Sequence, residues 1–122
     1  MTTESPSPRR PRKWIYSALL GAIGGALLEV PALFLAVLSG GLGHGHYVFA
    51  RALFPVPMLA TLLEGDTIGP ISQGLAFGQF PLYGAVLGLV AAYQKWRPLH
   101  ALIGIHLIAA VVAFAGVIPN FS

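Results

Sequence analysis

Four apolar runs, separated by short polar or glycine-rich segments, dominate the hydrophobic pattern of this chain. They cover residues 14–39, 47–63, 71–93 and 99–118. A helix needs roughly 20 apolar residues to cross a bilayer, and the first run has 26 residues with a single charge. The pattern predicts an all-α integral membrane protein. Residues 14–122 would form one transmembrane domain, a small bundle of four transmembrane helices.

The run over residues 47–63 leaves an alternative open. It is short for a span, Arg51 lies one turn inside it, and Pro55 and Pro57 each remove a backbone donor. The segment could instead be re-entrant or interfacial, leaving three spans. Length favours four spans. Basic residues favour three, because three spans place six of them on one side and one on the other, against four and three with four spans.

Composition supports a membrane location and argues against a nucleic-acid partner. The chain is 56% hydrophobic and only 9% charged, whereas soluble domains are roughly 25% charged. The basic pI of 9.7 comes from a cluster at residues 9–13, so no basic face remains on the folded part for phosphates. The lipid bilayer is therefore the expected partner, and no nucleic acid is expected.

Residues 1–13 combine three prolines with Ser, Thr and basic residues, which predicts a disordered tail. The apolar run that follows is longer than the roughly 7–15 residues of a cleaved signal. An uncleaved signal anchor in the cytoplasmic (plasma) membrane is the better interpretation. The basic cluster then places the N-terminus in the cytoplasm.

Glu29 is the charge inside the first run, and Pro31 follows two residues later. Polar residues within a span are functional suspects by default. If all four runs span, Glu29, Arg51 and His106 lie at similar depths below the outer face, which predicts that they meet as an intramembrane polar cluster. The simpler interpretation is an ion pair that holds the first helix to the second. The sharper one is that Glu29 exchanges a proton or cation along a path to the 44–46 loop. The further polar residues considered are Gln79, His44, His46 and His100.

Motifs for catalysis or for a resident metal are absent from the sequence. It has no phosphate loop, no HExxH, no GxSxG and no cysteine. His44 and His46 supply at most two ligands from a glycine-rich loop, so no metal site is predicted. The chain is not expected to be an enzyme or to carry a cofactor. A haem using His106 with a histidine from another segment or subunit stays an alternative.

Glycine pairs spaced four residues apart predict close helix packing. They are Gly21 and Gly25, Gly74 and Gly78, and Gly84 and Gly88. This is more small surface than four short helices need for each other. The leading hypothesis is therefore a non-enzymatic accessory or packing subunit that contacts other membrane-protein subunits or itself. The alternatives are a small transporter, channel or proton pathway using Glu29, and a haem or quinone site at His106.

Overall fold

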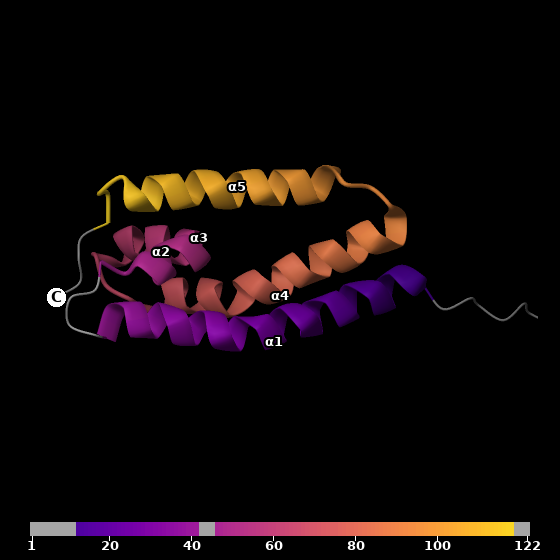
Figure 1. Ribbon diagram of the computed structural model, residues 1–122, viewed down its shortest axis with the longest axis horizontal. Helices are drawn as coiled ribbons and strands as arrows, with labels where there is room; N and C mark the ends of the chain where they lie inside the picture. Colours follow the sequence, from indigo (N-terminus) through magenta and orange to yellow (C-terminus); the bar gives the residue numbers. More distant parts are fainter. Residues whose placement is uncertain (1–11, 42–45, 119–122) are drawn as a thin grey trace, which may run out of the picture.

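The computed structural model describes residues 12–41 and 46–118, and these ranges contain helices and no strand. Three helices are long and apolar enough to cross a membrane: α1 (Lys13–Gly41), α4 (Pro70–Tyr93) and α5 (Arg97–Phe114). Three short helices separate α1 from α4: α2 (Val48–Leu53), α3 (Pro55–Ala60) and the 3-10 helix η1 (Thr61–Glu64). Figure 1 shows α1 and α4 side by side, with α5 on the other side of α2 and α3.

The long helices begin and end within a few residues of the apolar runs. Pro70 is at the start of α4, where its missing N–H costs nothing. Gln94 ends α4 in the left-handed conformation, with φ 54°. Pro81 lies inside α4, and Figure 1 shows the helix changing direction in its middle. Lys13 already belongs to α1, and residues 1–11 of the predicted tail lie outside the described residues.

The contact between α1 and α4 is antiparallel and runs backbone to backbone. A Cβ added at Gly21 would overlap the carbonyl group of Gly84, and one at Gly25 would overlap the carbonyl group of Phe80. Gly88 likewise lies against the carbonyl group of Ser17. Four of the six glycines selected from the sequence therefore permit this approach. Gly74 and Gly78 do not take part, since an added Cβ there would meet nothing within 4 Å.

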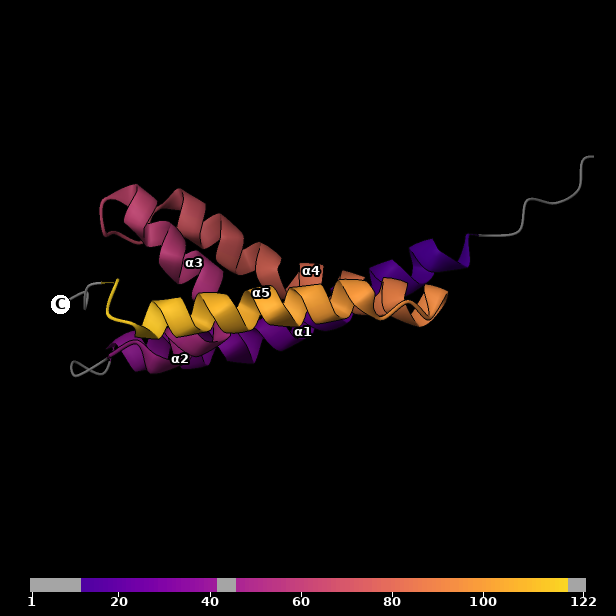
Figure 2. The same ribbon diagram turned by 90° about the horizontal axis from the view of Figure 1, so that it is seen from above.

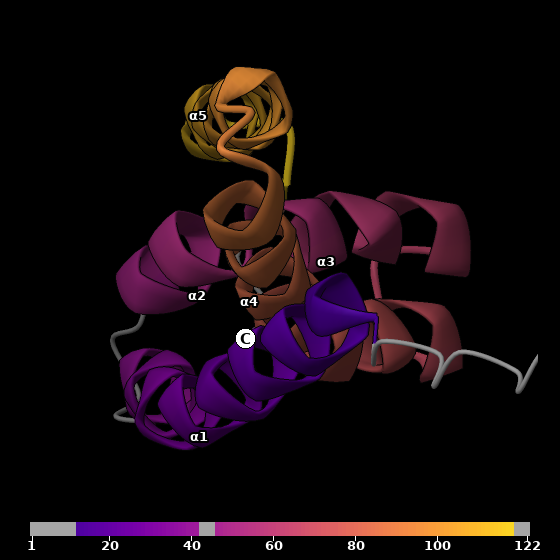
Figure 3. The same ribbon diagram turned by 90° about the vertical axis from the view of Figure 1, so that its right-hand side faces the viewer.

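The segment over residues 47–63 differs from the expectation of one spanning helix. It divides at Phe54, whose backbone angles of φ −126° and ψ 51° are not helical, into α2 and α3 of 6 residues each. The physical reason is the pair Pro55 and Pro57, which can donate no helical hydrogen bonds. Neither piece approaches the roughly 20 residues of a span. Figure 3 shows α2 and α3 running across the bundle, and Figure 1 shows the chain entering and leaving them at the same end.

Helix α5 packs against α3, α4 and α2, and its contact with α3 is the most extensive. A small buried cluster of Ala50, Met58, Ala113 and Ile118 joins α2 and α3 to the end of α5. Figure 2 shows the first half of α4 diverging from α1 together with α3. The short helices thus form a wedge that keeps α5 apart from the tightly packed α1–α4 pair.

Candidate functional site

The break at Phe54 leaves backbone carbonyl groups of α2 without helical donors. The last carbonyls of any helix lack partners within it, and the two prolines that follow supply no N–H. Inside a bilayer each unsatisfied group costs several kcal/mol, so irregular backbone is tolerated there only where protein groups satisfy it. Side chains from α4 and α5 meet this requirement.

Gln79 of α4 satisfies the first of these carbonyls. Its Nε2 donates to the carbonyl oxygen of Leu53 at 2.6 Å. The side chain is 6% exposed, and Phe80, the next residue, packs its ring 5.2 Å from the ring of Phe54. The middle of α4 and the break are therefore joined by one hydrogen bond and one aromatic contact. The amide beside Pro81 was singled out from the sequence, but its partner was not.

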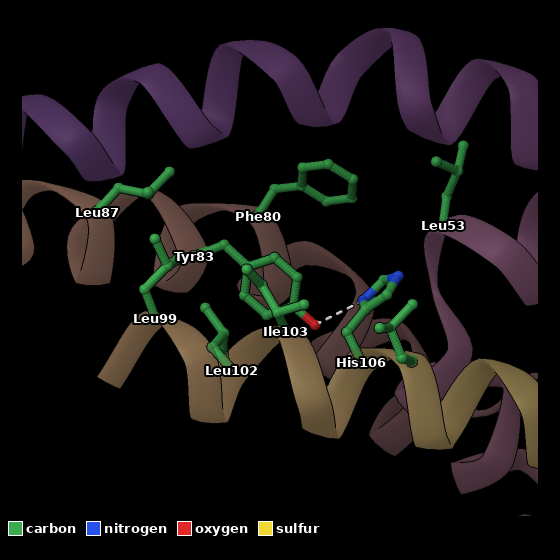
Figure 4. A pocket seen from close by; sticks show the side chains of 9 residues that line it. Leu53, Phe80, Tyr83, Leu87, Leu99, Leu102, Ile103 and His106 are labelled. Atoms are coloured by element: carbon green, nitrogen blue, oxygen red, sulfur yellow. Dashed lines mark hydrogen bonds between the residues drawn. The ribbon is translucent and has the colours of Figure 1, made fainter. Parts of the chain in front are cut away.

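His106 of α5 satisfies the second carbonyl and is itself held by Tyr83. Its Nε2 lies 3.0 Å from the carbonyl oxygen of Ala52, and its Nδ1 lies 2.9 Å from the hydroxyl oxygen of Tyr83. A carbonyl oxygen only accepts, so Nε2 carries the proton, and in the neutral ring Nδ1 accepts from the hydroxyl. Figure 4 shows the Tyr83 hydroxyl meeting the imidazole. Both ring nitrogens are engaged, so a haem iron on His106 would have to displace one of these bonds.

Arg51 is buried in α2 and contacts the chain beyond α5. A terminal guanidinium nitrogen donates to the carbonyl oxygen of Ile118 at 3.2 Å. Among residues 12–41 and 46–118, Arg51 and His106 bond backbone carbonyl groups, and no hydrogen bond or ion pair of either with Glu29 is found. That the three side chains form one polar cluster stays a prediction. The depths behind that prediction assumed that residues 47–63 span. Instead α2 runs crosswise, and His106 bonds the backbone of the break.

Glu29 lies on the buried face of α1, one helical turn after Gly25, which touches Phe80 of α4. Its side chain is 5% exposed, and its Oε2 has no hydrogen-bond partner. Leu33, one turn further along, lines a cavity of about 480 Å³ that extends to Gly40 and Gly41 at the end of α1. A buried acceptor without a hydrogen-bond partner thus lies one helical turn before a residue that lines the cavity.

The remaining histidines do not join this site. His44 lies outside the described residues, and His46 and His100 are exposed. Within residues 12–41 and 46–118, no three side chains of His, Asp or Glu gather as metal ligands would.

Glu64 has a structural role that the sequence did not reveal. Its carboxylate accepts backbone N–H groups at the start of α4, from Gly69 at 3.2 Å, Ile71 at 2.7 Å and Ser72 at 2.9 Å. Partial removal from water raises the pKa of Glu64, but the hydrogen bonds from Ser72, Ile71 and Gly69 outweigh this effect, and the net pKa lies below its ordinary value of 4.5. An acid a few residues before a proline-initiated helix is a weak sequence signal for such a cap.

Comparison with family models, curated proteins and solved structures finds no match to this chain.

Proposed function

We propose that this chain is a non-enzymatic subunit of a membrane assembly, with three spanning helices and one re-entrant segment. The observation that carries the proposal is the open glycine face of α4, made of Gly74 and Gly78. Without a hydrophobic driving force between helices in lipid, small residues that admit a second backbone are typical of helix interfaces. The other glycines of α4, Gly84 and Gly88, already contact α1 in this way. The open face has the same spacing and suits a helix of another subunit.

The arrangement of the helices supports the topology of the proposal. The end of α1 that carries Arg12 and Lys13 lies at the same end of the bundle as the α4–α5 turn with Lys95 and Arg97. Helix α2, which contains Arg51, lies toward the other end (Figure 1). Basic residues mark the cytoplasmic side, so the N-terminus is cytoplasmic and α5 ends outside, in the plasma membrane. The α2–α3 segment enters from the outer side, reaches the middle of the membrane at the break, and returns.

Two measurements test this proposal. Reporter fusions at the C-terminus should report an extracytoplasmic position, and a cytoplasmic signal would overturn the three-span topology. Native mass spectrometry after gentle extraction should show a complex of fixed stoichiometry with another subunit or a second copy. Gly78→Leu should abolish that complex, while Gly104→Leu should leave it intact, because Gly104 is equally open but lies on α5. A wild-type chain that is always monomeric contradicts the subunit role.

A proton or monovalent-cation pathway through Glu29 is the second candidate function. It is favoured by the buried Oε2 without a partner and by the neighbouring cavity toward the outer side. In liposomes, proton or sodium flux carried by the chain should be lost in Glu29→Gln. Flux that survives this substitution would remove Glu29 from the mechanism.

A further inference from the structure

An apolar groove of about 320 Å³ separates α4 from α5. Figure 4 shows its walls: Leu87 on α4 faces Leu99, Leu102 and Ile103 on α5. Leu53 of α2 and the Tyr83–His106 pair line its inner part. The volume is at the lower end of the range for ligand pockets in proteins.

The polar atoms along the groove satisfy one another. The Tyr83 hydroxyl bonds Nδ1 of His106, and Nε2 of His106 bonds the carbonyl group of Ala52. A ligand that needs hydrogen bonds, such as a quinone headgroup, would have to break this chain of bonds. A hydrocarbon chain needs none, so the chemistry of the walls favours hydrocarbon.

The length of the groove and the charged residues at its end indicate which hydrocarbon ligand would fit it. From Arg97, at the start of α5, to His106 is a rise of about 14 Å, close to half of the roughly 30 Å hydrocarbon core. The groove therefore matches one leaflet in depth. One end of the groove lies at the α4–α5 turn, where Lys95 and Arg97 are exposed together with Trp96. Basic residues flanked by an interfacial aromatic favour an anionic headgroup.

We propose that this groove holds one acyl chain of an anionic phospholipid from the cytoplasmic leaflet, with the headgroup at Lys95 and Arg97. The inference rests on the proposed topology, which places that turn on the cytoplasmic side. The lipid fills the space that the wedge of α2 and α3 keeps open between the two helices. It thereby supports α5, which packs less extensively on α4 than on α3.

The first test uses the purified full chain in native mass spectrometry, with phosphatidylglycerol and phosphatidylcholine of identical acyl chains. One phosphatidylglycerol should be retained, with a preference of roughly 5- to 25-fold, since each of the two basic residues near the surface contributes on the order of fivefold. The double variant Lys95→Gln, Arg97→Gln should lose the preference. Leu102→Trp should lose the bound lipid, whereas Ile108→Trp, on the exposed face of α5, should keep it. Equal retention of both lipids by the wild type would overturn the proposal.

The second test avoids any effect of substitution on folding. A phosphatidylglycerol with a diazirine in its acyl chain is photolysed with the unmodified protein, and the labelled residues are mapped by mass spectrometry. Labelling should concentrate on Leu87, Leu102 and Ile103 over Ile108 by several-fold. Uniform labelling of α5 would contradict a groove-bound chain. If the C-terminal reporter is external and labelling is uniform, the lipid proposal fails while the topology stands.

Discussion

Helix α4 has two sides that pack in opposite ways. Toward α1, glycines let the two backbones touch, as at Gly21 and Gly84. Toward α5, leucines and Ile103 leave a groove. In water, burial of the leucines would tend to close such a gap, but lipid tails are as apolar as leucine, so apolar area alone does not draw helices together. Helices therefore pack closely where small residues or hydrogen bonds stabilise the contact, and a gap can remain between them elsewhere.

The largest expected effect on stability comes from a substitution that prevents the close approach of α1 and α4. Gly84→Ala places a Cβ on the backbone of Gly21, and the overlap should lower the free energy of unfolding by about 1–3 kcal/mol or more. Gly78→Ala meets open space and should leave stability unchanged or raise it by up to about 1 kcal/mol through helix propensity. Reversible unfolding in mixed micelles measures both. Equal stabilities would show that the α1–α4 contact tolerates a methyl group.

The second prediction concerns the hydrogen bonds at the break. Gln79→Leu leaves the carbonyl group of Leu53 without its donor, which should cost about 1–3 kcal/mol in the same unfolding experiment. Gln73→Leu is the matched control, since its amide also donates to a carbonyl group, that of Ile68, but in an exposed position. The control should lose well under half as much. Similar losses would mean that burial of the break does not matter.

The third prediction probes the groove side alone. Tyr83→Phe removes the hydroxyl that bonds Nδ1 of His106, and the expected loss is about 0.5–1.5 kcal/mol. Tyr93→Phe, in an exposed position at the end of α4, should be neutral. Thermal unfolding of α5 measures both variants and is followed through a spin label on a cysteine introduced into that helix. The chain has no cysteine of its own, so the label attaches at this position alone. No change in Tyr83→Phe would show that the bond from α4 does not help to hold α5.

The smallest effect is expected at Glu64, outside both contacts. Because its pKa is lowered in the folded chain, its stabilisation is present above its unfolded pKa and is lost as pH falls through the folded pKa. Glu64→Gln should therefore be less stable than the wild type at pH 7. The two should converge as the pH drops below the ordinary value of 4.5. If the difference in stability between the variant and the wild type were the same at every pH in that range, the Glu64 carboxylate would not be the cap of α4.

The long helices were predictable because length and apolar composition determine them. The run over residues 71–93 became α4 (Pro70–Tyr93), and the first run became α1 (Lys13–Gly41). Within residues 47–63, Pro55 and Pro57 indicate a division of the helix, whereas the length of the apolar run favours one continuous helix. The sequence left a span and a re-entrant or interfacial segment both open, and in the structure the segment divides at Phe54 into two helices of 6 residues each.

The polar contacts were less predictable, since depth along a helix does not say which face a residue occupies. Glu29, Arg51 and His106 were grouped by depth alone. The carbonyl groups at the break indicate the polar contacts better than depth does. Pro55 and Pro57 have no N–H to donate, so the donors for these carbonyl groups must come from elsewhere in the chain. Gln79 and His106 are among the few side chains inside the long helices that could supply them. The tight fit of Gly21 on Gly84 needed the register of two helices, which the glycine spacing permits but does not specify.

The break at Phe54 also constrains the order in which this protein is made. Gln79 follows Leu53 by 26 residues, and His106 follows Ala52 by 54 residues. At synthesis rates of 5–20 residues per second, the carbonyl of Ala52 waits about 3 to 11 s for its donor. Until then the bare backbone has no favourable place in hydrocarbon. If the segment is re-entrant, as proposed, it should stay at the membrane surface and enter the bilayer only after the last helix has left the ribosome. Its entry would then be a late step in biogenesis.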